Sequence, residues 1–135
     1  MKKIALCMTI CIMLAALSAT VFAGGSERDK VPMVAYLSPD NDSEVDLTGT
    51  QSRTFKWKSA PIPGGGREAY RFKLAKGFGY DTIVSENLGQ GVFSTEVPAD
   101  KFEDGVTYSW YVQQCDASLM VWSRYDTWSF KVIKK

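Results

Sequence analysis

Residues 102–114 read FEDGVTYSWYVQQ, the clearest strand pattern in the 135-residue chain. After the turn at Gly105, large apolar side chains stand at every second position, at Tyr108, Trp110 and Val112. A period of two is that of a β-strand with one buried face. We therefore expect a strand that turns these three side chains into a core. The positions expected to face outward are Thr107, Ser109, Tyr111 and Gln113.

The same period returns in shorter segments along the chain, as where Phe55 and Trp57 alternate with lysines. Prolines and glycines, as in PIPGGG at residues 61–66, separate these segments, and none of them has a convincing helical pattern. Alternation with one polar face indicates antiparallel sheets packed on each other. The sequence therefore predicts an all-β fold, a seven-stranded antiparallel β-sandwich. The expected strands are 31–37, 54–58, 69–75, 81–86, 92–97, 106–114 and 128–132.

The N-terminal residues have the layout of a secretory signal peptide. Two lysines, Lys2 and Lys3, precede an uncharged apolar run at residues 4–17, and the small residues Val21 and Ala23 form a cleavage site. We therefore expect an exported protein. The predicted divisions are a signal peptide at 1–23 cleaved after Ala23, a flexible arm at 24–30 and one domain at 31–135.

Two alternatives to a cleaved signal fit less well. A retained membrane anchor needs roughly 20 apolar residues, more than the run at 4–17 provides. A lipoprotein needs a cysteine directly after the run, whereas Cys7 and Cys11 lie within it. The predicted mature form is therefore secreted, periplasmic or held at the cell surface, and it does not span the membrane.

The mature chain would be almost neutral. Loss of Lys2 and Lys3 reduces the 16 Lys and Arg residues to 14, against 15 Asp and Glu residues, which leaves a net charge of −1. A neutral domain has no broad field to attract nucleic acid or an anionic membrane. The chain also has no histidine, the side chain most used for acid–base chemistry near neutral pH and for binding metals. We therefore expect no enzyme, no cofactor and no nucleic-acid partner.

The strand at 106–114 and the turn before it resemble the sixth strand of a fibronectin type III domain. Tyr108 corresponds to the tyrosine-corner position, where a hydroxyl satisfies a backbone group while the ring stays buried. Trp57 corresponds to the buried tryptophan of the second strand. Leu37-Ser38-Pro39 is similar to the first strand and its turn, and Trp122-Ser123 to the bend before the last strand.

This resemblance covers residues 31–132 and implies a scaffold whose members bind proteins, glycans or one another. Structural roles in the core are expected for Trp57, Tyr108 and Trp110. Gln114 departs from the family pattern, which often has a small apolar residue there. Either its amide is hydrogen-bonded inside the fold or the strand leaves the core at that point.

The outward face of the second sheet is the preferred binding surface. Arg71 and Lys73 lie on one predicted strand, Tyr111 and Gln113 are expected on its neighbour, and Lys131 on the next. Tyrosine and arginine are enriched at interfaces, where they combine contact area with hydrogen-bond donors. The sequence therefore predicts an interaction module that binds a protein or forms part of an envelope or extracellular assembly. An ordinary solvated sheet face is the alternative, and the oligomeric state is left open.

A carbohydrate-binding module is the alternative function. Three of the four tryptophans fall at inward strand positions, and Trp122, before the last strand, is the least committed to the core. Further rings outside the core pattern are Tyr111 and Tyr125, with Phe78 and Tyr80 in a glycine turn. A glycan site needs two or three exposed rings among polar groups. The candidate glycan contacts are Trp122 and Tyr125.

Two further features resemble sites. Acidic residues alternate in the loop at 40–46, as calcium ligands do, but Val45 and Gln51 stand where an EF-hand loop needs glycine and glutamate. We therefore expect a solvated turn and no metal. Cys115 is the one cysteine left after cleavage. It forms an intermolecular disulfide or packs as a small buried apolar residue.

Overall fold

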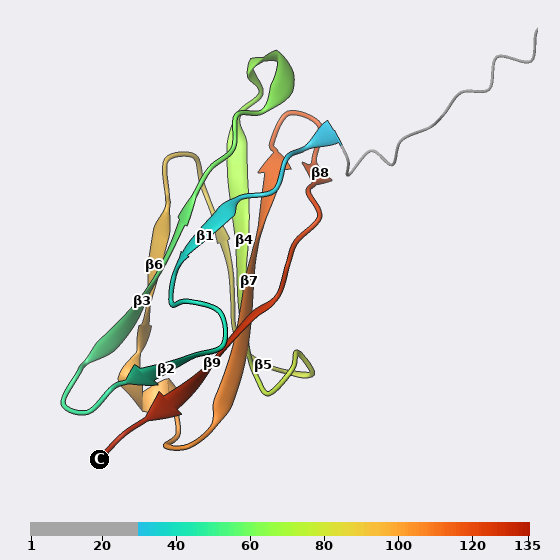
Figure 1. The fold of residues 1–135 in the computed structure, drawn as a ribbon. Coiled ribbons are helices and arrows are strands. Elements are labelled where there is room, and N and C mark those ends of the chain that lie inside the picture. Colours follow the sequence, from blue (N-terminus) through green and yellow to red (C-terminus); the bar gives the residue numbers. More distant parts are fainter. Residues whose placement is uncertain (1–29) are drawn as a thin grey trace, which may run out of the picture.

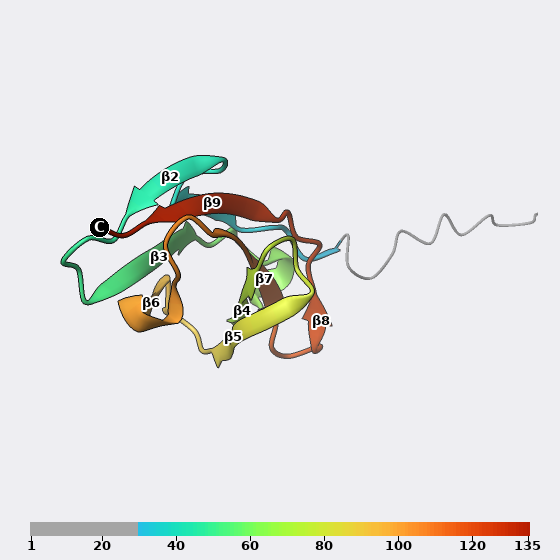
Figure 2. The same cartoon turned by 90° about the horizontal axis from the view of Figure 1, so that it is seen from below.

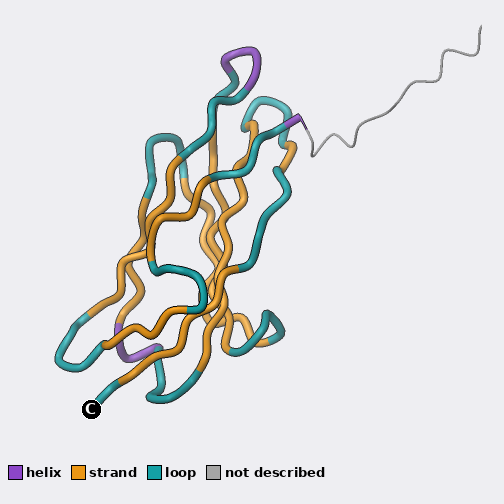
Figure 3. The backbone as a smooth tube through the Cα atoms, in the orientation of Figure 1, coloured by secondary structure: helices purple, strands orange, loops and turns teal. Residues whose placement is uncertain are grey.

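The computed structural model describes residues 30–135, and this part of the chain is an all-β structure with two sheets (Figure 1). Two short 3-10 turns, η2 (Pro63–Gly65) and η3 (Ala99–Lys101), lie between strands (Figure 3). The predicted signal peptide, its cleavage site and residues 24–29 of the predicted arm lie outside the described residues. Within residues 30–135, no helix has the length and apolar character needed to cross a membrane.

The two sheets differ in size, and Figure 2 views their strands from one end. The smaller sheet is antiparallel and has the order β1 (Ala35–Ser38), β3 (Ser52–Lys58), β6 (Ser94–Pro98). The larger sheet has the order β2 (Ser43–Asp46), β9 (Trp128–Ile133), β7 (Thr107–Asp116), β4 (Glu68–Lys76), β5 (Asp81–Leu88). The two-residue β8 (Val121–Trp122) pairs with the end of β7.

The strand count and one strand direction differ from the prediction. With β2 and β8, residues 30–135 contain nine strands instead of seven, and β2 pairs with β9 in parallel. Val45 and Leu47 are both buried, and the residues before, between and after them are exposed. The segment therefore has the period of two that is typical of a strand. The sequence predicts a loop there because turn-forming residues surround the segment. β8 is too short to show any period.

Aromatic side chains from both sheets fill the space between them. Phe55 of β3 packs on Phe72 of β4, with ring centroids 5.0 Å apart, and edge-on against Trp110 of β7 at 5.2 Å. Trp57, Tyr108 and Trp110 are all buried, as the alternating pattern predicts. Each large side chain removed from water in this way stabilises the fold by about 1.5–3 kcal/mol.

Two buried polar groups fix the ends of β7. The hydroxyl of Tyr108 accepts a hydrogen bond from the backbone N–H of Glu103 at 2.8 Å. At the other end, the buried Gln114 amide donates to the carbonyl of Ala60 at 2.8 Å, and its Oε1 accepts from the Ala60 N–H at 3.2 Å. Gln114 is thus hydrogen-bonded inside the fold, the first of the two alternatives that the sequence leaves open.

Candidate binding face

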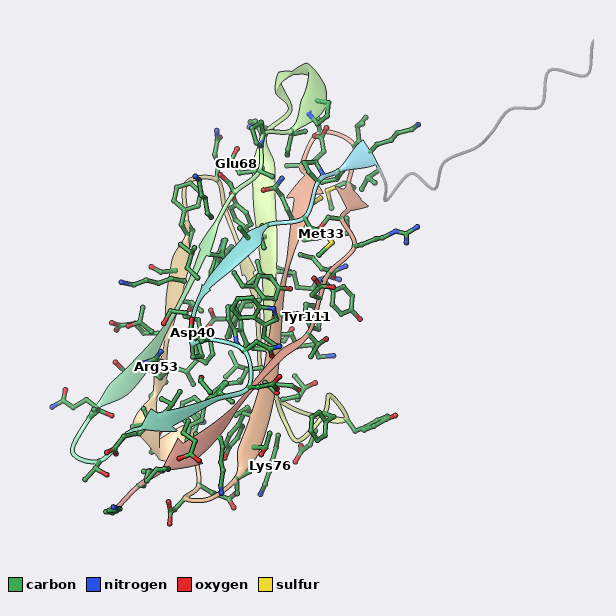
Figure 4. All side chains as sticks on the ribbon, viewed as in Figure 1. Met33, Asp40, Arg53, Glu68, Lys76 and Tyr111 are labelled. Carbon is green, nitrogen blue, oxygen red and sulfur yellow. The ribbon has the colours of Figure 1, made fainter. Side chains whose placement is uncertain are left out.

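The outward side chains of β4 and β7 meet near the middle of the larger sheet. Lys73 of β4 lies opposite Tyr111 of β7, and both side chains are half-buried. Figure 4 shows Tyr111 midway between Glu68 and Lys76, the two ends of β4. Because β4 and β7 pair over nine consecutive positions, the backbone at Lys73 and Tyr111 is held by a continuous ladder of paired residues.

Tyr111 has a second tyrosine on its outward side. Tyr125 comes from the segment between β8 and β9, and its ring stacks on that of Tyr111 with centroids 4.0 Å apart and 21° between the planes. Tyr125 is 44% exposed, so the free side of the pair reaches solvent. One residue predicted for protein binding and one predicted for glycan binding therefore form a single surface.

Arg71 and Trp122 form another stacked pair on the same side of the sheet. The guanidinium carbon of Arg71 lies 4.2 Å from the centroid of the Trp122 ring, within the range of a cation–π contact. Arg71 stands two residues before Lys73 on β4, so the two cations share one face. One side of the Trp122 ring is covered by this contact, and a sugar could stack only on the other.

Gln113 is not exposed, which corrects the expectation that its side chain faces solvent. It is 7% exposed, and its amide donates to the carbonyl of Ser123 at 3.0 Å. The reason is that the chain after β8 runs beside this end of β7, where the Ser123 N–H also donates to the Gln114 carbonyl at 2.7 Å. Gln113 holds that segment in place and offers little to a partner. Ser109, also expected to face outward, is buried as well.

Lys131 lies apart from this cluster. It is exposed, and it stands opposite Thr107 on β7 and Glu44 on β2. Thr107 and Tyr111 are four residues apart on one strand, a separation of roughly 13 Å. Lys131 therefore belongs to another part of the sheet. The residues that the fold brings together, called the candidate face below, are Arg71, Lys73, Tyr111, Trp122 and Tyr125.

A hollow of about 280 Å³ opens beside Tyr111. Phe78 and Tyr80 line it from the turn between β4 and β5, at the lower right of Figure 1. Phe78 is 76% exposed and Tyr80 is fully exposed. The sequence shows these two rings in a glycine turn, where they cannot join the alternating core pattern, but the predicted site did not include them. Other side chains of the lining are Lys73, Ser109, Tyr111, Tyr125 and Thr127.

The electrostatic character of the candidate face is basic. Among residues 30–135, the side chain of Lys73 has no hydrogen-bond or ion-pair partner, and the lining of the hollow beside it contains no Asp or Glu. Burial raises the pKa of the Tyr111 hydroxyl, and Tyr125 adds to this effect while Arg71 opposes it. The Tyr111 hydroxyl therefore keeps its proton at neutral pH and can donate a hydrogen bond.

Cys115 is buried and free, and burial raises the pKa of its thiol. In the described part of the chain, no group of three or more Cys, Asp or Glu side chains is placed to hold a metal ion.

A comparison with protein-family models and with curated proteins finds no match to this chain. Its function is therefore inferred from the geometry of the candidate face.

Proposed function

We propose that this chain is an exported, non-catalytic interaction module that binds a protein partner through the candidate face. The observation that carries the proposal is the stacked Tyr111–Tyr125 pair beside the two cations Arg71 and Lys73. Tyrosine and arginine anchors provide much of the binding energy at protein interfaces. The paired strands β4 and β7 hold Arg71, Lys73 and Tyr111 in place before binding, which lowers the entropy lost on association.

The scaffold that we propose is of the fibronectin type III kind. Two features support it: the hydrogen bond from the Glu103 N–H to the Tyr108 hydroxyl, as in a tyrosine corner, and a three-stranded sheet facing a larger one. Export is proposed from the signal-like residues 1–23. On such scaffolds function depends on the side chains of one surface and not on the fold itself.

A capture experiment tests the protein-binding proposal. The exported protein, carrying a C-terminal tag, is incubated with envelope extract and culture medium of the source organism, and retained proteins are identified by mass spectrometry. We expect a specific protein with the wild type that is lost with the double variant Arg71→Ala/Tyr111→Ala. The matched control, Lys56→Ala, changes an exposed residue of β3 on the other sheet. Equal capture by all three proteins would reject this face.

A carbohydrate-binding module is the second candidate, because the hollow combines exposed rings with the hydroxyl groups of Ser109 and Thr127. Sugars bind where aromatic surface lies among polar groups. If this second candidate is correct, the tagged protein in the capture experiment would retain polysaccharide and no specific protein. Binding would quench tryptophan fluorescence and would be lost in Tyr125→Ala or Trp122→Ala.

A further inference from the structure

Lys73 is a half-buried cation without a counter-charge. It stands between Tyr111 of β7 and Ser85 of β5 in the interior of the sheet. Lys76, three residues along β4, forms an ion pair with Glu103 at 2.7 Å, whereas Lys73 has none within residues 30–135. A carboxylate supplied from outside would form a charge-assisted hydrogen bond with the Lys73 ammonium, and such a bond is stronger than one between neutral groups.

The hollow beside Lys73 suits an anion in its other groups too. Ser109, Tyr111 and Tyr125 contribute hydroxyls to the lining, and no acidic side chain of the lining would repel a carboxylate. The mature chain as a whole is close to neutral. Attraction of an acidic ligand to this place would thus come from the local arrangement and not from the field of the whole protein.

The spacing of the cations matches the repeat of an extended peptide. Arg71 and Lys73 occupy alternate positions on one face of β4, which separates their Cα atoms by roughly 7 Å. Acidic residues at alternate positions of an extended segment have the same separation for the same reason. The next alternate position of β4 is Ala75, which lines the hollow together with Phe78 and Tyr80 and offers apolar contact.

We infer that the partner presents an extended acidic segment to the candidate face. Its two carboxylates, at alternate positions, bind Arg71 and Lys73, and an apolar side chain at the next alternate position packs against Phe78 and Tyr80. This inference rests on the proposed function and names the chemistry of the partner. The strand-like spacing of the cations and the apolar third contact favour a peptide over an acidic sugar.

The probe for this inference is the capped peptide Ac-Glu-Ser-Glu-Ser-Phe-NH2, and its matched control is Ac-Gln-Ser-Gln-Ser-Phe-NH2. Each is titrated into the isotopically labelled exported protein at low salt, and amide chemical shifts are followed by NMR. We expect shift changes at β4, β7 and the turn with Phe78 for the acidic peptide, and affinity about tenfold weaker for the amide peptide, because charge-assisted hydrogen bonds are lost. Raising the salt concentration should weaken only the acidic peptide.

Two variants separate charge from folding. Lys73→Gln should weaken the acidic peptide about tenfold and leave the amide peptide unchanged, whereas Lys73→Arg should keep binding. Lys56→Gln, on the opposite sheet, should have no effect. The dispersed NMR spectrum of each variant shows directly that it is folded.

Several outcomes would overturn the inference. Equal binding of the two peptides, no shift with millimolar acidic peptide, or an unchanged affinity in Lys73→Gln would each reject it. Shifts produced by glucuronic acid but not by the peptide would assign the hollow to an acidic sugar. If the protein captured in the envelope experiment is lost with Arg71→Ala/Tyr111→Ala but kept with Lys73→Gln, the proposed function stands and this inference fails.

Discussion

The hydroxyl of Tyr108 stabilises the fold through one hydrogen bond, from the backbone N–H of Glu103 at 2.8 Å. Its ring packs edge-on against Phe102 with centroids 5.0 Å apart. Tyr108→Phe keeps this ring contact and leaves the backbone donor without its acceptor, so the free energy of unfolding should fall by about 1–2 kcal/mol. Urea denaturation followed by fluorescence measures the loss. Tyr80→Phe, on a fully exposed side chain, is the control, and equal stabilities for the two variants would contradict the prediction.

For some residues of the candidate face, strand alternation alone decides on which side of the sheet the side chain lies, and these residues were predictable from the sequence. Arg71, Lys73 and Tyr111 lie on the predicted side of their strands because the residues between them are core residues. Gln113 follows the same alternation, yet it is buried by a segment that comes ten residues later in the chain. Local periodicity carries no information about such a segment. The stacking of Tyr125 on Tyr111 depends on the same segment and was unpredictable for the same reason.

At the scale of elements, the sequence predicts the central strands better than the edges. β4 and β7 have long alternating runs with large aromatic residues, and they appear close to their predicted bounds. β2 has four residues, of which Val45 is the one buried side chain, so its pattern is hard to separate from a polar loop. Its pairing with β9 comes from tertiary packing, since the Asp42 N–H donates to the Ser129 carbonyl at 2.7 Å just before the strand.

The segment that follows β8 depends on Ser123. The Ser123 hydroxyl is buried, accepts the backbone N–H of Gln114 at 3.0 Å and donates to the carbonyl of Arg124 at 2.7 Å. Ser123→Ala should lower the free energy of unfolding by about 1–3 kcal/mol because a buried N–H loses its acceptor. Hydrogen exchange of the Gln114 amide should become faster, and the capture of the partner should weaken as Tyr125 loses its support. Ser118→Ala, on an exposed turn, should change none of these. Unchanged exchange at Gln114 would mean that other bonds hold the segment.

At the scale of the whole molecule, a neutral chain presents a local basic and aromatic surface on one sheet. The residues of the candidate face come from β4 and from the consecutive elements β7, β8 and the segment after β8. β4 is far from the others in sequence and meets β7 through antiparallel pairing. The opposite sheet is tied to this one by Tyr36 of β1, whose hydroxyl donates to the carbonyl of Asp126 at 2.5 Å and accepts from the Val112 N–H at 3.1 Å. The aromatic core and this link make the molecule a rigid support for the face.

The same burial makes the stability of the whole molecule sensitive to alkali. Burial is the largest cause that raises the pKa of Tyr36, Tyr70 and the Cys115 thiol above their ordinary values. Such a group holds its proton more tightly in the folded state than in the unfolded state. Its full contribution to stability is present below its pKa in the unfolded state. The contribution is lost as the pH rises through its pKa in the folded state. The free energy of unfolding should therefore fall from about pH 9, first with the thiol and then with the tyrosines, with a slope of up to about 1.4 kcal/mol per pH unit for each group.

Urea denaturation at intervals of pH measures this slope. Cys115→Ala should flatten the curve between about pH 9 and 10, where an ordinary thiol has already ionised and an ordinary tyrosine begins to do so. Tyr36→Phe should be less stable at neutral pH and should lose stability less steeply above about pH 10. A wild-type stability that stays level to pH 12 would mean that the thiol and the tyrosines titrate alike in the folded and unfolded states, and it would contradict the raised pKa values.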